Sequence, residues 1–157
     1  MSQVTIRTAN KQDVLRLAPL INQAFAIETF LDGTRTDEER LSATMQKGDV
    51  LIAECDGQAL ASVYVELRGE RAYFGMLAVD SSQQGKGLGK MMTAAAEQYG
   101  RKRGCKRMEM SVLSLRPELL PFYRSLGYSE TGTEEFHPPR RLIGDVACHC
   151  ILMSKPL

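Results

Sequence analysis

The chain contains 157 residues, of which 43% are hydrophobic and 25% are charged. This length is typical of one domain, so we expect a single domain over residues 1–157. The hydrophobic fraction is sufficient for a packed core and excludes intrinsic disorder. Twenty Lys and Arg residues against nineteen Asp and Glu residues give a formal net charge of +1, which argues against nucleic acid as a partner.

Composition also sets expectations for location and for cysteine chemistry. No apolar stretch approaches the roughly 18 residues of a membrane span, and the first residues lack the pattern of a secretory signal. We therefore expect a soluble, cytoplasmic protein with no membrane partner. The four cysteines have no CxxC spacing and are expected to be free thiols. Cys148, His149 and Cys150 are expected to be buried or half-buried strand residues, and no metal site is predicted.

Hydrophobic periodicity and turn residues predict strands and helices along the whole chain. A helical apolar pattern follows Asn10 and Asp13, either of which suits an N-cap. Asp56-Gly57 is the strongest hairpin signal, and Gly69-Glu70 marks a second turn. The predicted strands are 4–7, 50–55, 59–67, 71–79, 107–113, 128–136 and 146–153, and the predicted helices are 14–25, 37–45, 88–103 and 118–125.

These elements predict an α+β fold with a mixed, mainly antiparallel sheet of about six or seven strands and flanking helices. The strands at 71–79 and 107–113 flank a helix and are expected to be parallel. Gly75 predicts a bulge or a close approach inside its strand. Pro117 suits a first helical turn, and residues 138–141, Pro-Pro-Arg-Arg, predict a surface loop. The 88–103 helix is expected to bury a stripe formed by Leu88, Met91, Met92, Ala95 and Tyr99.

A glycine-rich segment, residues 84–89, lies directly between a predicted strand and a predicted helix. Backbone N–H groups and the positive end of the helix dipole converge there, which favours an anion. Alternating glycines allow a phosphate to approach the main chain closely, while Lys86 and Lys90 add positive charge. The segment predicts a pyrophosphate site, and the simpler alternative is a glycine-rich turn with no ligand.

Two common nucleotide motifs do not fit this segment. A P-loop requires Ser or Thr after its Gly-Lys pair, and after Gly89-Lys90 this chain has Met91. A P-loop also requires a glycine five positions before that Gly-Lys pair, and the chain has no glycine five positions before Gly89. The dinucleotide pattern GxGxxG also fails, and the preceding strand is not the first of the chain. The spacing therefore disfavours nucleoside triphosphate and NAD chemistry.

Gln84, Gly87 and Gly89 match the Q/R-x-x-G-x-G/A signature of the GNAT superfamily, the acetyl-CoA-dependent N-acetyltransferases, which the chain resembles. Residues 77–79, Leu-Ala-Val, precede the signature as the family's signature strand does. Residues 121–128, PFYRSLGY, are similar to the short helix and the Tyr-x-x-x-Gly-Phe/Tyr segment of that family. Residues 151–155 resemble its final strand, so the resemblance covers nearly the whole chain.

The resemblance implies a GNAT fold and acetyl-CoA as co-substrate. The backbone amides of the loop would hold the CoA pyrophosphate, and pantetheine would lie along the signature strand, where a backbone N–H polarises the thioester carbonyl. The implied cofactor-binding residues are Leu77, Ala78, Val79, Gln84, Gly85, Lys86, Gly87, Leu88, Gly89 and Lys90.

Tyr123 resembles the family's tyrosine near the CoA sulfur. Because a phenol with a pKa of about 10 can protonate the departing thiolate, the resemblance implies that Tyr123 is the general acid. The alternative is a tyrosine that packs against the sheet with its hydroxyl in solvent.

Two positions depart from the family pattern. Tyr73 stands where many members carry a glutamate base on the signature strand, and Arg116 stands where many carry an asparagine. The candidate bases are Glu28, Asp32 and Glu66. The alternative for each is an ordinary solvated carboxylate on the surface, and no base is assigned.

The acceptor is expected to bind between two irregular segments, the one between the first two helices and the loop 134–141. Glu28, Asp32, Glu134 and Glu135 would favour a cationic amine. Phe136, His137 and Arg140 would favour an aromatic or anionic group, and the sequence does not choose between them.

The sequence thus predicts an enzyme that transfers acetyl from acetyl-CoA to a primary amine by direct attack, with no metal and with a small-molecule acceptor favoured over a protein amine. Two alternatives are a non-catalytic acyl-CoA sensor or interaction module and an α+β domain without a ligand. A homodimer through an exposed final strand stays open.

Overall fold

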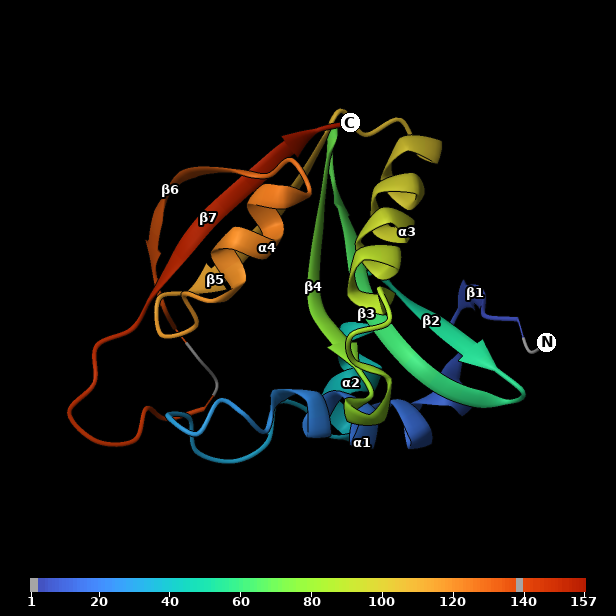
Figure 1. Cartoon of the computed structure of the whole chain (residues 1–157), viewed down its shortest axis with the longest axis horizontal. Helices are drawn as coiled ribbons and strands as arrows, with labels where there is room; N and C mark the ends of the chain where they lie inside the picture. Colours follow the sequence, from blue (N-terminus) through green and yellow to red (C-terminus); the bar gives the residue numbers. More distant parts are fainter. Residues whose placement is uncertain (1–2, 138–139) are drawn as a thin grey trace.

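The computed structural model describes residues 3–137 and 140–157. Within them, seven strands form one mixed sheet in the order β1-β2-β3-β4-β5-β7-β6 (Figure 1). All neighbours are antiparallel except β4 and β5, which confirms the predicted fold class and the predicted parallel pair. The strands are β1 (Thr5–Thr8), β2 (Asp49–Cys55), β3 (Gln58–Arg68), β4 (Arg71–Val79), β5 (Arg107–Leu113), β6 (Ser129–Glu135) and β7 (His149–Pro156).

Helices cover both faces of this sheet (Figure 1). They are α1 (Val14–Phe25), α2 (Glu38–Thr44), α3 (Leu88–Lys102) and α4 (Leu119–Ser125), with short 3-10 turns η1 (Lys11–Asp13) and η2 (Ser81–Gln83). Side chains of β2 and β3 alternate between two cores, one beneath α3 and α4 and the other beneath α1 and α2. None of the helices in the described part of the chain combines the length and apolar character that crossing a membrane requires.

The bounds of several elements differ from the prediction. The last strand begins at His149 and not at residue 146, so Cys148 precedes it, His149 is exposed and Cys150 is half-buried. Pro117 lies outside α4 and not in its first turn, since Glu118 is the N-cap residue of this helix. The backbone around Pro117 forms a turn with i to i+3 hydrogen bonds, from Leu119 N to Arg116 O and from Leu120 N to Pro117 O. In the described residues, no group of three or more His, Cys, Asp or Glu side chains is placed to hold a metal ion.

The buried face of α3 is rotated from the predicted stripe. Met91 is exposed, and the buried residues are Leu88, Met92, Thr93, Ala96, Glu97 and Gly100. Small residues explain the difference, because a Cβ at Gly100 would lie only 3.2 Å from the Cβ of Ala72 on β4. The helix packs closest where its side chains are smallest, and periodicity of large apolar residues does not report this.

A bulge interrupts β4 at its centre. Tyr64 of β3 pairs with Gly75 and Ser62 pairs with Ala78, so β4 carries one extra residue between these pairs. Met76 has a left-handed backbone with φ of 50°. The predicted bulge therefore lies just after Gly75. Gly75 is also a point of close approach, because a Cβ at this position would be 2.8 Å from the Tyr73 hydroxyl. Because of the extra residue, side chains on the two sides of the bulge no longer alternate in phase.

Asp13 connects the start of the first helical segment to the sheet. Its buried carboxylate accepts hydrogen bonds from Arg7 at 2.8 and 2.9 Å, from Arg16 at 2.9 Å and from the Asn10 backbone at 2.8 Å, which completes a capping box. The Arg7 guanidinium holds the pKa of Asp13 well below its usual range.

We expect Asp13→Asn to lower the free energy of unfolding at pH 7 by about 1–2 kcal/mol. Because folding lowers the pKa of Asp13, its carboxylate adds to the free energy of unfolding above the unfolded-state pKa of about 4. This contribution is lost as the pH falls below that value toward the folded-state pKa. Urea unfolding at pH 7 and pH 3 measures it, with the exposed Asp145→Asn as control. An equal difference at both pH values would contradict the assignment.

Candidate active site

The two parallel strands separate soon after they begin. β4 and β5 pair only from Arg71 to Tyr73 and from Arg107 to Glu109, and Figure 1 shows them diverging beyond this point. A cavity of about 720 Å³ lies at the divergence. Its lining includes Phe74 and Leu77 from the core beneath α3, and Met76 and Phe25 from the core beneath α1. The cavity therefore connects the two faces of the sheet.

The glycine-rich loop lines one end of this cavity. Gly85 and Gly87 have φ values of 81° and 79°, and a Cβ at either position would have nothing within 4 Å. Gly87 is the N-cap residue of α3 and no side chain caps the helix, so the first amides of α3 have no capping side chain to donate to. Open space and uncapped amides at one helix end suit a bound phosphate.

Most residues with a predicted role in cofactor binding line the cavity. They are Leu77, Val79, Gln84, Gly85, Gly87, Leu88, Gly89 and Lys90. Two do not: Ala78 is buried beneath α1, and Lys86 donates to the side chain of Gln83 at 3.2 Å. Gln83, which sequence reasoning did not single out, lines the cavity beside them.

Tyr123, on α4, lines the cavity from the other side of the divergence. Its ring packs against Phe74, Phe122 and Tyr128 at centroid distances of 5.9, 4.9 and 6.1 Å. Within the described residues its hydroxyl makes no hydrogen bond, although the residue is only 5% exposed. Burial raises the pKa of Tyr123 to about 12, against an opposing effect of Arg116. The ring is thus held in place while the protonated hydroxyl remains available.

A buried polar cluster supports Tyr123 from behind. The Tyr128 hydroxyl donates to Glu97 at 2.8 Å, and Lys155 donates to the second oxygen of that carboxylate at 3.0 Å. Burial and this hydrogen bond raise the pKa of Tyr128. The sequence analysis did not predict a role for Glu97. Its burial could have been inferred from its place beside Ala96 on the small-residue face of α3.

Two loops close the opposite end of the cavity, here called the acceptor end: the α1–α2 loop (26–37) and the β6–β7 loop (136–148). An isolated bridge between Leu31 and Leu142 joins them, with Asp32 N donating to Arg141 O at 2.8 Å. As predicted, both loops border the cleft; their lining residues are Glu28, Leu31 and Arg35 from the first, and Phe136, His137 and Arg140 from the second. Arg140 is buried, which corrects the predicted surface position, while 138–139 lie outside the described residues.

Of the three candidate bases only Glu28 lines the cavity. Asp32 is exposed, and Glu66 accepts hydrogen bonds from Tyr64 and Arg68 on β3. Arg116 donates to Glu28 at 3.0 Å and thereby connects the acceptor end to the vicinity of Tyr123.

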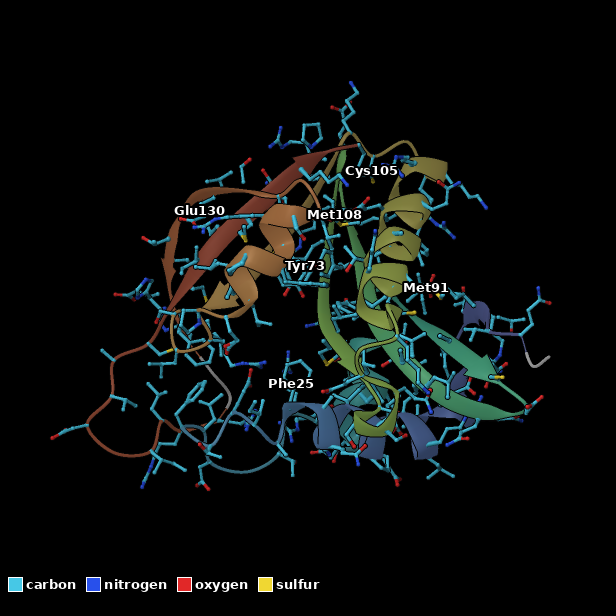
Figure 2. The ribbon with its side chains drawn as sticks, in the orientation of Figure 1. Phe25, Tyr73, Met91, Cys105, Met108 and Glu130 are labelled. Carbon is cyan, nitrogen blue, oxygen red and sulfur yellow. The ribbon has the colours of Figure 1, made fainter. Side chains whose placement is uncertain are left out.

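Tyr73 lines the cavity where the family resemblance predicts a base. Its ring lies beneath the Arg68 guanidinium at 4.1 Å, and burial raises its pKa. Figure 2 labels Tyr73 beside β4 and Phe25 at the end of α1, both of which border the cavity. A tyrosine with a raised pKa stays protonated and is a hydrogen-bond donor at neutral pH.

Comparisons with known proteins agree with this geometry. The model of the acetyltransferase (GNAT) family matches residues 17–128. The fold is similar to the ribosomal-protein-S18-alanine N-acetyltransferase of Escherichia coli, with a TM-score of 0.80 and 19% identity over 98% of this chain and 94% of that one. It is also similar to an N-acetyltransferase of Staphylococcus aureus Mu50, with a TM-score of 0.79 and 16% identity over 99% of both chains.

A further similar structure is yncA of Salmonella typhimurium, solved with its cofactor acetyl-CoA, with a TM-score of 0.76 and 21% identity over 98% of this chain and 93% of that one. No curated protein matches the sequence significantly. The family match covers more than two thirds of the chain, from within α1 to the residue before β6, and includes the glycine-rich loop and Tyr123. This chain therefore belongs to the GNAT family of acetyltransferases.

Proposed function

We propose that this protein transfers the acetyl group of acetyl-CoA to a primary amine by direct attack, and that the acceptor is a small molecule. One observation carries the proposal: a single cavity joins the uncapped start of α3, the separated strands and Tyr123. Gly85 and Gly87 line the cavity with nothing within 4 Å of a Cβ at either position, which leaves room for a pyrophosphate beside them. When bound, acetyl-CoA supplies a thioester from which the amine nitrogen takes the acetyl group as the C–N bond forms and the C–S bond breaks.

Residues of the chain have distinct roles in this proposal. Amides at the start of α3 bind the pyrophosphate, and Leu77 and Val79 border the pantetheine. Tyr123 donates its proton to the departing sulfur, and its raised pKa keeps that proton in place until the thiolate forms. The attacking amine loses its proton to solvent or to the acceptor end.

Cys150 supports direct attack over a covalent enzyme intermediate. Cys150 is the only cysteine among the described residues that line the cavity, and burial raises the pKa of its thiol. The thiolate is the nucleophilic form, so a raised pKa leaves Cys150 protonated and unreactive at neutral pH.

Thermal unfolding with acetyl-CoA tests cofactor binding. At 100 times its Kd a ligand adds about 2.7 kcal/mol, which raises the Tm of a chain of this length by about 5–10 °C. We expect Gly87→Ala to abolish most of this rise, because its Cβ enters the phosphate space. ATP and NAD, as control ligands, should give no rise.

Gly104→Ala is the matched control, because Gly104 has a φ of 81°, follows the other end of α3 and also has nothing within 4 Å of a Cβ. Both substitutions strain a left-handed residue by about 1 kcal/mol, so both lower the Tm without ligand. Only Gly87→Ala should weaken acetyl-CoA binding. Equal weakening by both, or no rise for the unchanged protein, would overturn the proposal. Binding without CoA release from any amine would instead indicate a sensor.

A further inference from the structure

Charged side chains are unbalanced at the acceptor end of the cavity. Among the described residues, the lining there includes three arginines, Arg35, Arg116 and Arg140, against the single carboxylate of Glu28. The other acidic residues of the two loops do not line the cavity, nor does Glu135 at the end of β6, which forms an exposed pair with His137 at 3.2 Å. The acceptor end therefore has an excess of positive charge.

Glu28 neutralises only part of this excess. Its Oε2 accepts a hydrogen bond from Arg116 Nη1 at 3.0 Å, and its Oε1 lies 3.8 Å from Arg140 Nη1, an ion pair too long for a hydrogen bond. Its side chain is 5% exposed. One buried carboxylate is thus shared between two guanidinium groups, and a buried charge without a full partner is unfavourable.

Arg140 has an unused donor at this position. Its Nε donates to the carbonyl of Asp32 at 3.0 Å, which fixes the side chain between the two loops. Its Nη1 is buried and has no hydrogen-bond partner among the described residues, while the side chain as a whole is 8% exposed. A buried donor without an acceptor costs free energy that a ligand oxygen would recover.

Arg35 adds a second incompletely paired guanidinium. It lies over the ring of Phe25 at 5.3 Å and, within the described part of the chain, makes no ion pair with a carboxylate. Burial lowers its pKa, opposed by Tyr73 and Glu28. Desolvation of a cation that has no close anion favours an anionic ligand beside it.

We propose that the acceptor is a small amine that also carries an anionic group, a carboxylate or a phosphonate, and that Arg140 and Arg35 bind this group. This inference rests on the proposed function. Guanidinium groups bind such anions with two parallel hydrogen bonds, which orients the amine at the other end of the molecule. The cavity volume lies in the range of small-ligand sites and is shared with the acyl donor, which favours a small acceptor over a protein. Polyamines would be repelled.

Matched acceptors test the proposal. Amino acids and aminoalkyl phosphonates are each compared with the uncharged amide or alcohol of the same chain, with 1,3-diaminopropane as a cationic amine and with an acidic N-terminal peptide. Acetylation is followed by thiol release, and binding by thermal shift of the CoA-loaded protein. We expect the anionic amines to exceed their uncharged partners at least 10-fold in kcat/KM, or to be the only ones that raise the Tm. The carboxylate and phosphonate arms identify which anion is preferred.

Arginine variants connect this preference to the site. Arg35→Gln and Arg140→Gln should lower kcat/KM for anionic amines at least 10-fold, mainly through KM, and leave the acetyl-CoA thermal shift unchanged. Arg35→Gln removes no backbone hydrogen bond of the described structure, so it remains informative if Arg140→Gln loosens the loops. Arg141→Gln, an exposed neighbour that does not line the cavity, is the control.

Equal use of uncharged or cationic amines, a preference for the peptide, or equal losses with all acceptors would overturn this inference. If no acceptor is acetylated and no anionic probe raises the Tm of the CoA-loaded protein, the inference is also overturned. Absence of any acetyl-CoA shift in the unchanged protein would instead overturn the proposed function, so the two failures are distinguishable.

Discussion

Replacing Tyr123 by phenylalanine is expected to lower kcat by about 100-fold or more, the effect of removing a positioned general acid. The ring remains packed between Phe74, Phe122 and Tyr128, so the shape of the cavity and the KM for acetyl-CoA should change little. Since the Tyr123 hydroxyl has no hydrogen-bond partner among the described residues, the Tm should stay within about 1 °C. Steady-state kinetics and thermal unfolding of the same samples measure both effects.

The pH profile is a second readout of Tyr123. With a pKa of about 12, this group stays protonated throughout the usual assay range and should cause no loss of kcat/KM up to about pH 10. The rate should instead rise with pH as the acceptor amine loses its proton. A fall centred near pH 8 in the unchanged protein that disappears in Tyr123→Phe would contradict the proposed environment.

Tyr99→Phe is the matched control for this substitution. The Tyr99 hydroxyl donates to Asp49 at 2.7 Å and does not line the cavity. Its loss should reduce stability by about 1 kcal/mol and leave kcat unchanged, the reverse of the pattern for Tyr123. If both substitutions reduce kcat equally, Tyr123 is not the general acid.

Glu97→Ala is expected to have the largest effect on stability, a loss of about 2–3 kcal/mol. The substitution leaves the buried Tyr128 hydroxyl without an acceptor and the Lys155 ammonium, whose side chain is 25% exposed, without its close anion. For a chain of this length the Tm should fall by about 5–10 °C. Urea unfolding and thermal unfolding at pH 7 measure the loss, with the exposed neighbour Gln98→Ala as control.

A double-mutant cycle separates the contact with Tyr128 from other effects of Glu97→Ala. Tyr128→Phe removes the hydroxyl and keeps the ring that packs on Tyr123. Combined with Glu97→Ala it should cost less than the sum of the two single losses, because both remove the same hydrogen bond. Additive losses would show that the Glu97–Tyr128 contact contributes nothing to stability.

Local signals were sufficient for most of the fold and for the loop at the start of α3. Gly85 and Gly87 stand out in sequence because a left-handed backbone favours glycine, and Asp37 caps α2 where its side chain predicts a helix start. These features depend on a few consecutive residues, so their physical causes are contained in the sequence itself.

Other features of the site depend on contacts between distant segments. Arg140 reads as a surface residue beside two prolines, yet the bridge between the two loops buries it against the carbonyl of Asp32. The bulge at Met76 shifts the alternation of β4, so Phe74 and Leu77, which are three residues apart, both pack in the core beneath α3. The local pattern gives no signal for the burial of Arg140, and Gly75 predicts a bulge in β4 without its effect on the alternation.

The sequence by itself therefore determined the order of strands and helices, the glycine-rich loop and the position of Tyr123 on a short helix, since backbone propensity and apolar periodicity act over a few residues. Only the tertiary structure decided which face of α3 is buried, that Glu97 pairs with Tyr128, and that three arginines line the acceptor end beside the one carboxylate of Glu28. Burial and charge balance are properties of segments brought together from across the chain, which is why the character of the acceptor site emerges only in the folded protein.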